Sequence, residues 1–408
     1  MPTNGRKHVL DGYKALDFTQ FVAGPTVTKM MAEMGAEVIK VELAPDGDRS
    51  RGMPFLKNER SGYFVQQNRG KLSLCLDPRS EAGKTIIREL IAKVDVMVEN
   101  FAPGVIGRMG FDYKTVRKIN PKLIMCSVST FGQDGPLAND PGYDFIGQAY
   151  AGVTSLSGEE GGAHYPPMLA LGDVSTGVHG LAAIACALLH RERSGEGQHL
   201  DISLVDAYFS YHDVWVQTLS SSGGTVKPVR TGLHYSVLAP AGMFKGREAY
   251  ILIFAWLDHH WIKLCELMGR PELGRDPRFI DISSRVKNRV GVIEAIEIWL
   301  QSMPSDEAAI AALREARLPC GPVLTVEKAM QHPHLVKRQT VQTVHDRILG
   351  DFQIPGFPLR FSSFPGRLDL QAPFLGEHNE RILSSWLGYS ADRVARLTQE
   401  GVLRSLPR

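Results

Sequence analysis

Residues 14–42 read KALDFTQFVAGPTVTKMMAEMGAEVIKVE, and this stretch decides the fold. Lys14 to Phe18 and Glu37 to Glu42 are short apolar runs typical of buried strands. Pro25 to Met34, between them, has the pattern of a helix that Gly35 closes. A strand, a helix and a second strand in this order form a βαβ unit, in which the two strands run parallel.

The alternation continues through the first half of the chain. Further strands are predicted over Leu72 to Leu76, Val94 to Val98, Leu123 to Val128 and Gln198 to Ile202, and helices over Ser80 to Lys93 and Ser175 to Arg193. The last of these helices is nearly apolar, so we expect it to be buried. Repeated βαβ units predict an α/β fold with a parallel sheet.

The pattern of the sequence changes near Ser220. The stretch SSSGGTVKPVR is rich in Ser, Gly and Pro and is a candidate linker. A β-like run follows at Glu248 to Phe254, and the pattern after it is mostly helical. We therefore predict a large α/β domain over residues 1–220, a smaller domain over residues 225–335, and a C-terminal return over residues 340–408 that completes the large domain.

The composition is that of an ordinary globular protein of 408 residues. Lys and Arg number 46 against 44 Asp and Glu, so the chain has no excess of positive charge to neutralise the phosphates of a nucleic acid. None of the five cysteines lies in a CxxC motif, which argues against a disulfide scaffold. The N-terminus lacks a signal peptide's apolar core, and the longest apolar run, Leu181 to Leu189, is too short to span a bilayer. We expect a cytoplasmic protein with no membrane partner.

Common cofactor and catalytic motifs are missing from the sequence. It has no GxGxxG fingerprint, no GxxxxGK[ST] loop and no GxSxG elbow, which disfavours a Rossmann dehydrogenase, a P-loop enzyme and an α/β-hydrolase. His259 and His260 would point about 100° apart on a helix, and Pro333 interrupts the pair His332 and His334. We therefore predict no metal site.

Asp173 is the most informative acidic residue. An apolar, strand-like run from Leu169 ends at Gly172-Asp173, and a long apolar helix follows at once. This order places Asp173 at a strand-to-helix turn, where helix amides and the helix dipole favour a carboxylate. Gly172 and Gly177 bracket the turn, as the close approach of a ligand requires. A carboxylate there can act as a nucleophile, and the alternative is an aspartate that only caps the helix.

A second candidate site is the loop from Asn100 to Gly104, which follows the strand ending at Val98. The helix that this loop opens carries Arg108. An asparagine, an aromatic ring and a nearby arginine at the carboxyl end of a parallel strand suit a nucleotide with phosphates. The alternative is a simple Pro-Gly turn with an exposed arginine.

Several motifs occur together and in order along nearly the whole chain. They are ALDFTQFVAGP (Ala15 to Pro25), MGAEVIKVE (Met34 to Glu42), GDRSRG (Gly47 to Gly52), VMVENFAPGVIGRMGF (Val96 to Phe111), PGYDFIGQAYAG (Pro141 to Gly152), LGDVSTG (Leu171 to Gly177), RSGEGQHLDISLVDA (Arg193 to Ala207), LPCGPV (Leu318 to Val323) and LGEH (Leu375 to His378). In these motifs the chain resembles the class III CoA-transferases, the group that contains formyl-CoA transferase and carnitine CoA-transferase.

The resemblance implies a fold and an assembly. It implies a Rossmann-like large domain with a parallel sheet, built from both ends of the chain, and a smaller α+β domain between them. It also implies an interlocked homodimer, in which each subunit is threaded by the other. Coenzyme A and acyl-CoA would be substrates together with a carboxylic acid, and no cofactor would be bound permanently.

The resemblance also implies a mechanism, in which Asp173 matches the family's catalytic aspartate. Its carboxylate would attack the thioester of an acyl-CoA and form an aspartyl-acyl anhydride. The CoA thiolate would then form an aspartyl-CoA thioester, from which CoA passes to the acceptor acid. Amides around Gly172 and Gly177 would be the oxyanion donors.

Contacts with CoA are implied by position. Val22 and Ala23 match residues that line the CoA site. The loop that holds the adenosine and phosphates matches Asn100, Phe101, Ala102 and Arg108. A stretch near the nucleotide matches Leu76, Asp77, Pro78 and Arg79, and a stretch near the pantetheine and the reacting centre matches Asp140, Pro141, Gly142 and Tyr143. Leu43 stands where some members have an arginine, and Arg49 or Arg51 would replace it.

Two other functions stay open from the sequence. An α-methylacyl-CoA racemase shares this fold and pairs the same aspartate with a histidine, but Tyr143 of the Tyr143-Asp144 dipeptide stands at that position. A tyrosine, with a pKa of about 10, is a poor general base near neutral pH. A non-catalytic CoA-binding protein is the other alternative. Arg230, His234 and Tyr235 are candidates for binding the acceptor carboxylate, or else belong to the linker surface.

Overall fold

The structure is a computed structural model that describes residues 7–406. It divides into two compact units, the first formed by the chain up to Ala151, by Met168–Tyr211 and by the chain from His334 onward. The second unit comprises Gly152–Pro167 and His212–Pro333. The sequence placed residues 152–167 and 212–220 in the large domain. Residues 212–220 belong to the second unit because the Ser- and Gly-rich stretch after Ser220 ends a helix of that unit, α9 (Trp215–Ser221), instead of linking two domains. Residues 152–167 belong to it because the Gly232 N–H and the Arg230 side chain donate to carbonyl groups of this segment.

The first unit is built on a six-stranded sheet with the order β5-β2-β1-β6-β7-β8. All neighbouring strands are parallel, which confirms the predicted α/β fold. The chain adds strands on one side of β1 and then returns to add β6 on its other side, so the sheet has its topological switch point between β1 and β6. The six strands are β1 (Lys14–Asp17), β2 (Glu37–Leu43), β5 (Lys71–Leu76), β6 (Val96–Glu99), β7 (Ile124–Ser129) and β8 (His199–Ser203).

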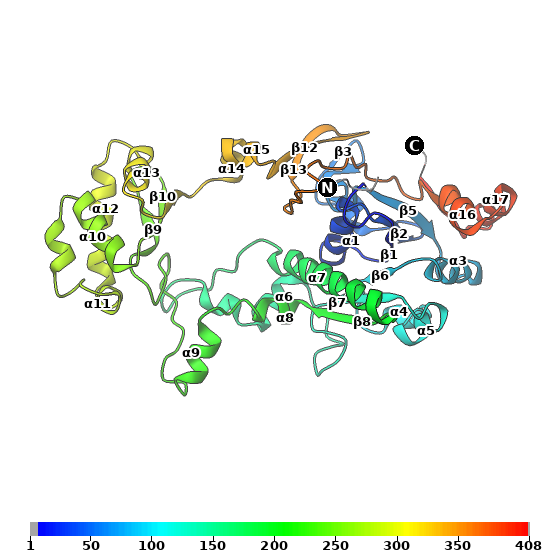
Figure 1. The fold of residues 1–408 in the computed structure, drawn as a ribbon, viewed down its shortest axis with the longest axis horizontal. Helices are drawn as coiled ribbons and strands as arrows, with labels where there is room; N and C mark the ends of the chain where they lie inside the picture. The colour runs from blue at the N-terminus through cyan, green and yellow to red at the C-terminus, as the bar shows by residue number, and fades with distance from the viewer. Residues whose placement is uncertain (1–6, 407–408) are drawn as a thin grey trace. The chain divides into compact units, whose positions relative to one another are not determined.

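Helices cover both faces of the sheet and enclose two apolar cores (Figure 1). One core lies under α1 (Ala23–Glu33) and α7 (Leu171–Ser194). The other lies under α3 (Glu81–Ile91), α5 (Tyr113–Ile119), α16 (Asn379–Leu387) and α17 (Ala391–Gln399). The C-terminal helices therefore complete the core that the N-terminal strands begin.

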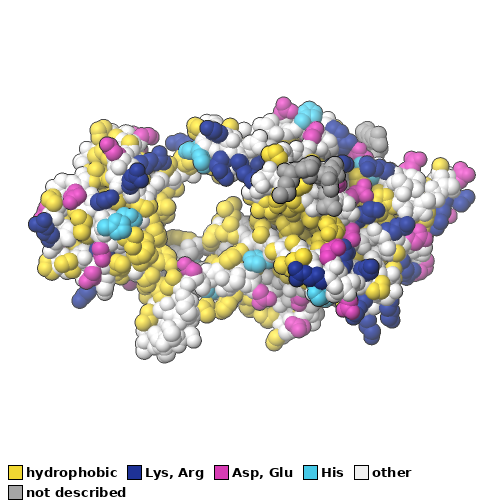
Figure 2. All heavy atoms as spheres, viewed as in Figure 1, with side chains coloured by type: hydrophobic (Ala, Val, Ile, Leu, Met, Phe, Trp, Pro, Cys, Tyr) yellow, Lys and Arg dark blue, Asp and Glu magenta, His cyan; other side chains and the backbone are white. Residues whose placement is uncertain are grey.

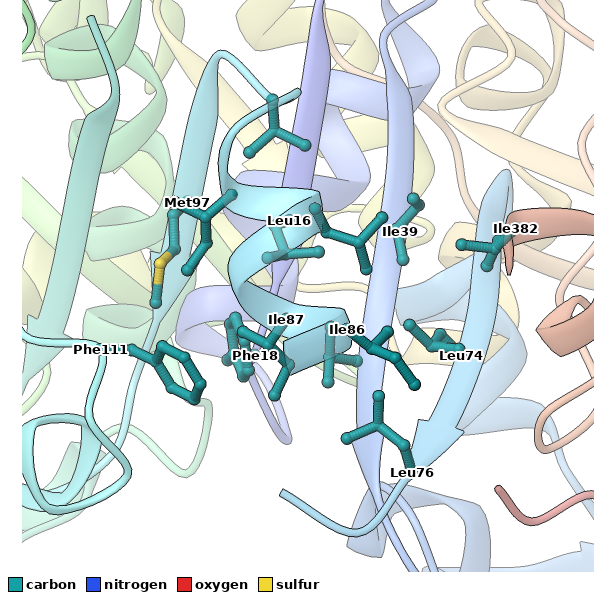
Figure 3. Close-up of a cluster of buried hydrophobic side chains, with 14 of the residues drawn as sticks. Leu16, Phe18, Ile39, Leu74, Leu76, Ile86, Ile87, Met97, Phe111 and Ile382 are labelled. Carbon is teal, nitrogen blue, oxygen red and sulfur yellow. The ribbon is translucent and has the colours of Figure 1, made fainter. Parts of the chain in front are cut away.

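Helix α3 shows how sequence pattern becomes packing. The Ser80 hydroxyl caps the helix by accepting the Gly83 N–H at 3.0 Å. Ile86, Ile87 and Leu90 share one stripe of the helix and are at most 1% exposed. Figure 3 shows Ile86 and Ile87 pointing toward side chains of the sheet. Burial of each such side chain stabilises the fold by about 1.5–3 kcal/mol.

Helices α1 and α7 approach each other closely because glycines lie at their contact. A Cβ atom at Gly177 would stand 2.6 Å from the Thr26 Cβ and 2.9 Å from the Ala23 carbonyl oxygen. A Cβ atom at Gly180 would stand 3.0 Å from Val27. The backbone of α7 therefore rests directly on α1, which an alanine at Gly177 would prevent.

Two expectations about α7 need correction. The helix begins at Leu171, and no strand precedes it, because residues 169–170 lie in an irregular segment. It is buried on one face only, since Val174, Val178 and Leu189 are 44–55% exposed. Among residues 7–406, α7 is the one helix long and apolar enough to cross a membrane, and 44% of its apolar stretch is buried inside the protein. Its buried face packs on α1 and the sheet, as the core helix of a globular domain does.

The second unit is an α+β structure. Its antiparallel sheet has the order β11-β10-β9. Helices cover one face of this sheet, whereas Tyr250, Leu252 and Phe254 on the other face are 38–45% exposed. Figure 2 shows apolar side chains gathered there, and acidic and basic side chains interspersed elsewhere. The elements are β9 (Ala241–Lys245), β10 (Tyr250–Phe254), β11 (Cys320–Pro322), η2 (Val153–Leu156), α10 (Asp258–Leu267), η3 (Pro271–Arg275), α11 (Ile282–Lys287), α12 (Arg289–Ser302), α13 (Asp306–Glu315) and α14 (Val326–Gln331).

A hairpin of the C-terminal return is tied to the N-terminal part of the first unit. Arg60 donates to both Asp346 carboxylate oxygens, at 2.8 Å for the closest pair, and both side chains are at most 6% exposed. The hairpin strands are β12 (Val341–Asp346) and β13 (Gly350–Pro355). The remaining elements are η1 (Arg49–Gly52), β3 (Leu56–Lys57), β4 (Arg60–Ser61), α2 (Gly62–Asn68), α4 (Val105–Arg108), α6 (Asp144–Tyr150), α8 (Leu204–Phe209) and α15 (Pro333–Lys337).

The α1–α7 contact gives the first testable prediction. Gly177→Ala should lower the free energy of unfolding by about 1–3 kcal/mol, because a methyl group there is forced against α1. Gly107→Ala is the matched control, since a Cβ at Gly107 would meet its nearest neighbour at an ordinary 3.6 Å. Urea unfolding followed by circular dichroism measures both variants. Equal stability of Gly177→Ala and wild type would show that the two helices can separate at no cost.

Candidate active site

Asp173 lies in the first turn of α7 and is half-buried. Its backbone N–H has no partner within the helix and donates instead to the Asp144 Oδ2 atom at 2.7 Å. Asp144 is the first residue of α6 and is 4% exposed. The hydrogen bond therefore holds two acidic side chains, from two different helices, next to each other.

Tyr208 of α8 supports this pair from behind. Its hydroxyl donates to the Asp144 Oδ1 atom at 2.7 Å and accepts from the Gln148 amide at 3.3 Å. The Tyr208 ring packs against Gly172, where a Cβ atom would come within 2.1 Å of it. Both Asp144 oxygens thus accept a hydrogen bond. The buried Tyr208 ring fixes the position of the first turn of α7.

The surroundings of Asp173 change its acidity. Burial, and then the neighbouring Asp144 charge, raise the pKa of the Asp173 carboxyl to about 7. Burial also raises the pKa of the Tyr63 hydroxyl to about 12, with Asp173 and Asp48 adding to the effect. The pKa of Tyr208 is raised to about 12 by burial and by its hydrogen bond to Asp144. Near neutral pH, Asp173 is therefore a carboxylate of unusually high basicity among neutral hydroxyls.

The roles expected for Gly172 and Gly177 are corrected by the packing. Their missing side chains make room for Tyr208 and for α1. The Gly172 backbone is hydrogen-bonded to the Tyr208 hydroxyl. Gly177 lies in the second turn of α7, where its N–H points to the preceding turn of the helix. These two amides are engaged within the protein, and they are not free oxyanion donors.

The loops after β1 and β6 meet at the switch point of the sheet. Asn100 accepts the Gln20 N–H at 2.8 Å and donates to the Gln20 carbonyl at 2.9 Å. The Lys40 ammonium also holds the first loop, by donating to the Thr19 carbonyl at 2.7 Å. Val22 and Ala23 lie where this loop enters α1, next to the contact with Gly177. The structure thus places Ala23 against α7 at Gly177, one turn after Asp173, while Val22 precedes Ala23 in the chain and Asn100 packs on the first loop.

The other residues of the second loop are only partly fixed. Phe101 donates its N–H to the Glu99 carboxyl at 2.9 Å. Burial raises the pKa of Glu99 to about 7, against hydrogen bonds from Ser127 and Phe101. Ala102 and Arg108 are exposed, and Arg108 makes no ion pair with any residue from 7 to 406. An exposed arginine at the end of α4 is available to an anionic ligand.

The stretch from Leu76 to Arg79 lies farther from Asp173. It follows β5, which is the edge strand and is separated from β1 by β2. Leu76 is fully buried in the core beside α3, so its side chain has no surface for a ligand. Pro78 is also buried, whereas the Arg79 side chain is 83% exposed and pairs with Asp77 at 2.9 Å. Only Asp77 and Arg79 of this stretch present charged groups outward.

The stretch from Asp140 to Tyr143 leads directly into α6. Asp140, Pro141 and Tyr143 are exposed, and Tyr143 is 72% so. Gly142 packs on Thr130, since a Cβ there would come within 2.5 Å of that side chain. The neighbouring Asp144 binds the Asp173 amide, so this stretch reaches the first turn of α7 through the chain itself.

Arg51 does not supply the basic group that is missing at Leu43. That guanidinium donates to both Glu42 oxygens, at 2.7 and 2.6 Å, and stacks on the Phe64 ring at 3.7 Å. Arg49, two residues earlier, is exposed and makes no ion pair with the described part of the chain. Arg49 is therefore the basic group that remains available in this loop.

The comparison of the whole chain with known families agrees with this arrangement, because residues 10–379 match the profile of CoA-transferase family III. The chain belongs to CoA-transferase family III. The formyl-CoA:oxalate CoA-transferase of Streptomyces coelicolor is 34% identical over 411 residues, which cover 97% of this chain and 99% of that relative. The succinyl-CoA:glutarate CoA-transferase of Mus musculus is 31% identical over 97% of this chain and 90% of its own length.

Solved structures show the same fold. A crystal structure of a CAIB/BAIF family protein from Brucella suis superposes with a TM-score of 0.82 at 33% identity. The alignment covers 93% of this chain and 100% of that chain. As a family III CoA-transferase, the protein transfers CoA, which fits a carboxylate in the α/β unit that carries the switch point of the sheet.

Sequence reasoning missed the residues that support Asp173. From the sequence, Asp144 was named only as the neighbour of Tyr143 in a dipeptide. No motif pointed to Tyr208 or Gln148. Their roles arise from contacts between α6, α7 and α8, which are far apart in the sequence. Of the acceptor candidates, Arg230 holds a turn of the second unit by donating to the Glu159 and Gly162 carbonyls at 3.1 Å. His234 also lies in that unit, where burial lowers the pKa of its ring.

The raised pKa of Asp173 predicts a pH-dependent cost to stability. The group keeps its proton up to about pH 7 in the folded chain but only to about pH 4 when unfolded. The cost of ionising it in the fold therefore grows from pH 4 to 7 and is complete above pH 7. Asp173→Asn should raise the free energy of unfolding by about 1–3 kcal/mol at pH 8, allowing for partial solvent screening, and by almost nothing at pH 4.

Urea unfolding of both proteins from pH 4 to pH 8, at one protein concentration, measures this difference. Asp206→Asn is the control, because Asp206 is an exposed acid near the start of α8. A constant difference between Asp173→Asn and wild type across this range would contradict the assigned direction of the shift.

Proposed function

We propose that the protein moves CoA from an acyl-CoA to a carboxylic acid through covalent intermediates on Asp173. The carboxylate attacks the thioester carbonyl, forming a C–O bond and breaking the C–S bond, which releases the CoA thiolate. The thiolate then attacks the aspartyl carbonyl of the anhydride and expels the donor acid as a carboxylate. The acceptor carboxylate attacks the resulting aspartyl-CoA thioester, which breaks its C–S bond, releases the thiolate and forms a second anhydride. The thiolate then attacks the acceptor's carbonyl in this anhydride, which forms the new acyl-CoA and releases the Asp173 carboxylate.

The placement of Asp173 is the observation that carries this proposal. It is half-buried in the first turn of a long helix, and its backbone is fixed by Asp144. Partial burial limits hydrolysis of an anhydride or a thioester, since either is lost if water attacks it. A pKa of about 7 makes the carboxylate a better nucleophile than an exposed aspartate while leaving about half of it ionised at neutral pH.

Racemisation is less well supported by these contacts. It needs a second acid–base group opposite Asp173. Tyr143 stands at the position in question with its ring 72% exposed. The adjacent Asp144 already accepts hydrogen bonds from the Asp173 amide and from Tyr208 on its two oxygens. Neither group is arranged to exchange a proton with a substrate carbon.

We further propose a cytoplasmic homodimer that needs no permanently bound cofactor and no metal. The apolar side chains exposed on α7 and on β10 support a second protein surface against them. The bound CoA would lie at the switch point with its phosphates near Arg49 and Arg108. The relatives' names support a small dicarboxylic acid as acceptor or donor.

Asp173→Asn should abolish CoA exchange between two acids, with a fall in kcat of at least about 10³-fold, because the amide oxygen is no nucleophile. Wild-type protein incubated with succinyl-CoA and then hydroxylamine should carry a hydroxamate at Asp173, found by peptide mass spectrometry. Asp206→Asn should keep both properties. Full exchange activity in Asp173→Asn would end the proposal, and exchange of the α-proton with D₂O without any acceptor would favour racemisation.

The acceptor class is tested with a panel of acids. With succinyl-CoA or acetyl-CoA as donor, dicarboxylates of two to five carbons should form CoA thioesters faster than carnitine-like, aromatic or steroid acids. Mass spectrometry of the products measures the rates. The highest kcat/KM for a bulky monocarboxylate would contradict the assignment of a small dicarboxylate.

A further inference from the structure

The two carboxyl groups at the first turn of α7 are more than a structural contact. Asp144 lies within hydrogen-bond distance of the Asp173 amide and is 4% exposed. Its charge therefore acts on Asp173 with little screening by water. A helix that needed only a cap would be served by a neutral serine or threonine at this position.

The hydrogen bonds of Asp144 hold its carboxyl group in place beside the first turn of α7. The Tyr208 hydroxyl donates to Oδ1 at 2.7 Å, and the Asp173 N–H donates to Oδ2 at 2.7 Å. Each Asp144 oxygen therefore has its own donor, so the side chain has little freedom to rotate. Gln148 holds the Tyr208 hydroxyl in turn, and Gly172 lets the ring come close enough to reach. These contacts together fix the Asp144 carboxyl group in one position next to Asp173.

The proposed mechanism changes the charge of Asp173 at each covalent step. The free side chain is an anion, whereas the anhydride and the aspartyl-CoA thioester are neutral at the same atoms. A fixed negative charge beside Asp173 raises the free energy of the free carboxylate and leaves the neutral adducts much less affected. The equilibrium between free and loaded Asp173 therefore depends on Asp144.

We propose that Asp144 is a positioning residue that favours covalent loading of Asp173, an inference that rests on the proposed function. Its carboxylate destabilises the resting anion relative to the anhydride and the thioester. Tyr208 and Gln148 hold that charge in place. The pKa of Asp173, raised to about 7 by burial and by Asp144, is the resting-state sign of the same repulsion.

Other groups around the first turn of α7 do not oppose this effect. Asp144 of α6 is the charge that acts on Asp173, Asp173 acts in turn on Tyr63 of α2, and Tyr208 of α8 binds Asp144. Both tyrosines are neutral below about pH 12. Helix α1 packs on α7 at Gly177 through Ala23 and Thr26, neither of which carries a charge. Asp144 is thus the charge that sets the balance.

Asp144→Asn tests the inference, because asparagine keeps the shape and one acceptor oxygen but removes the charge. The acid limb of kcat/KM for the acyl-CoA should move down by about one pH unit or more, because free Asp173 then ionises more easily. The ratio of loaded to free protein, read from intact mass after mixing with acetyl-CoA, should fall by about tenfold or more. Tyr208→Phe should move both readouts in the same direction, by less.

Matched controls are Asp206→Asn and Tyr211→Phe, whose side chains are exposed and lie in or just after α8. They should leave the acid limb and the loaded ratio unchanged. A merely structural role of Asp144 would lower the rate at every pH without moving the limb, and that result would overturn the inference. If Asp144→Asn does not fold, an unshifted limb and an unchanged loaded ratio in Tyr208→Phe would overturn it.

The experiment separates failure of the inference from failure of the proposed function. If wild-type protein forms no adduct and Asp173→Asn still exchanges CoA, then the covalent route itself is wrong. If wild-type protein forms the adduct but Asp144→Asn keeps the same limb and the same loaded ratio, then only the role of Asp144 is wrong.

Discussion

The close approach of α7 to α1 is the constraint on which the site depends. Gly177 and Gly180 let the backbone of α7 pack directly on Thr26 and Val27 of α1. Because an α-helix is stiff, this contact fixes the turn that precedes it, where Asp173 lies. The same contact places Asp173 beside the loop that enters α1 at the switch point of the sheet. A shift of α7 would therefore move the reacting carboxylate away from the loops that meet there.

Buried ion pairs stabilise the position of those loops. Lys71 binds Asp17 at 2.9 Å and Lys40 binds Asp48 at 2.8 Å, with all four side chains at most 1% exposed. Burial opposes the charge of Asp17, but Lys71 and Lys40 still hold its pKa down to about 2. Desolvating such charges is costly, and replacement by apolar residues is often neutral for stability. What they supply here is geometry, since Asp17 and Lys40 also bind the backbone of Thr19, at the start of the loop.

Local sequence pattern predicted the elements of the first unit well, because buried strands and capped helices carry their own signals. The strands around Leu16, Ile39 and Met97 were predicted within a residue or two of their observed ends. The irregular segment before Asp173 was mistaken for a strand, since a short apolar run looks the same in both cases. Arg51 was one of two candidates to replace the arginine missing at Leu43, and it instead pairs with Glu42. Such pairings depend on contacts between distant segments, as does the support of Asp173 by Tyr208, and local pattern cannot reveal them.

The C-terminal helices α16 and α17 belong to the same core as β5 and α3. During synthesis, the six strands of the large unit and the whole second unit therefore leave the ribosome before α16 and α17 can cover that core. The second unit has its own core within a nearly continuous stretch of chain and can fold while the large unit waits. The first unit must keep an apolar sheet face covered by other means during that time. Nascent chains of this protein should thus depend on chaperones more than a protein of equal length with sequential domains.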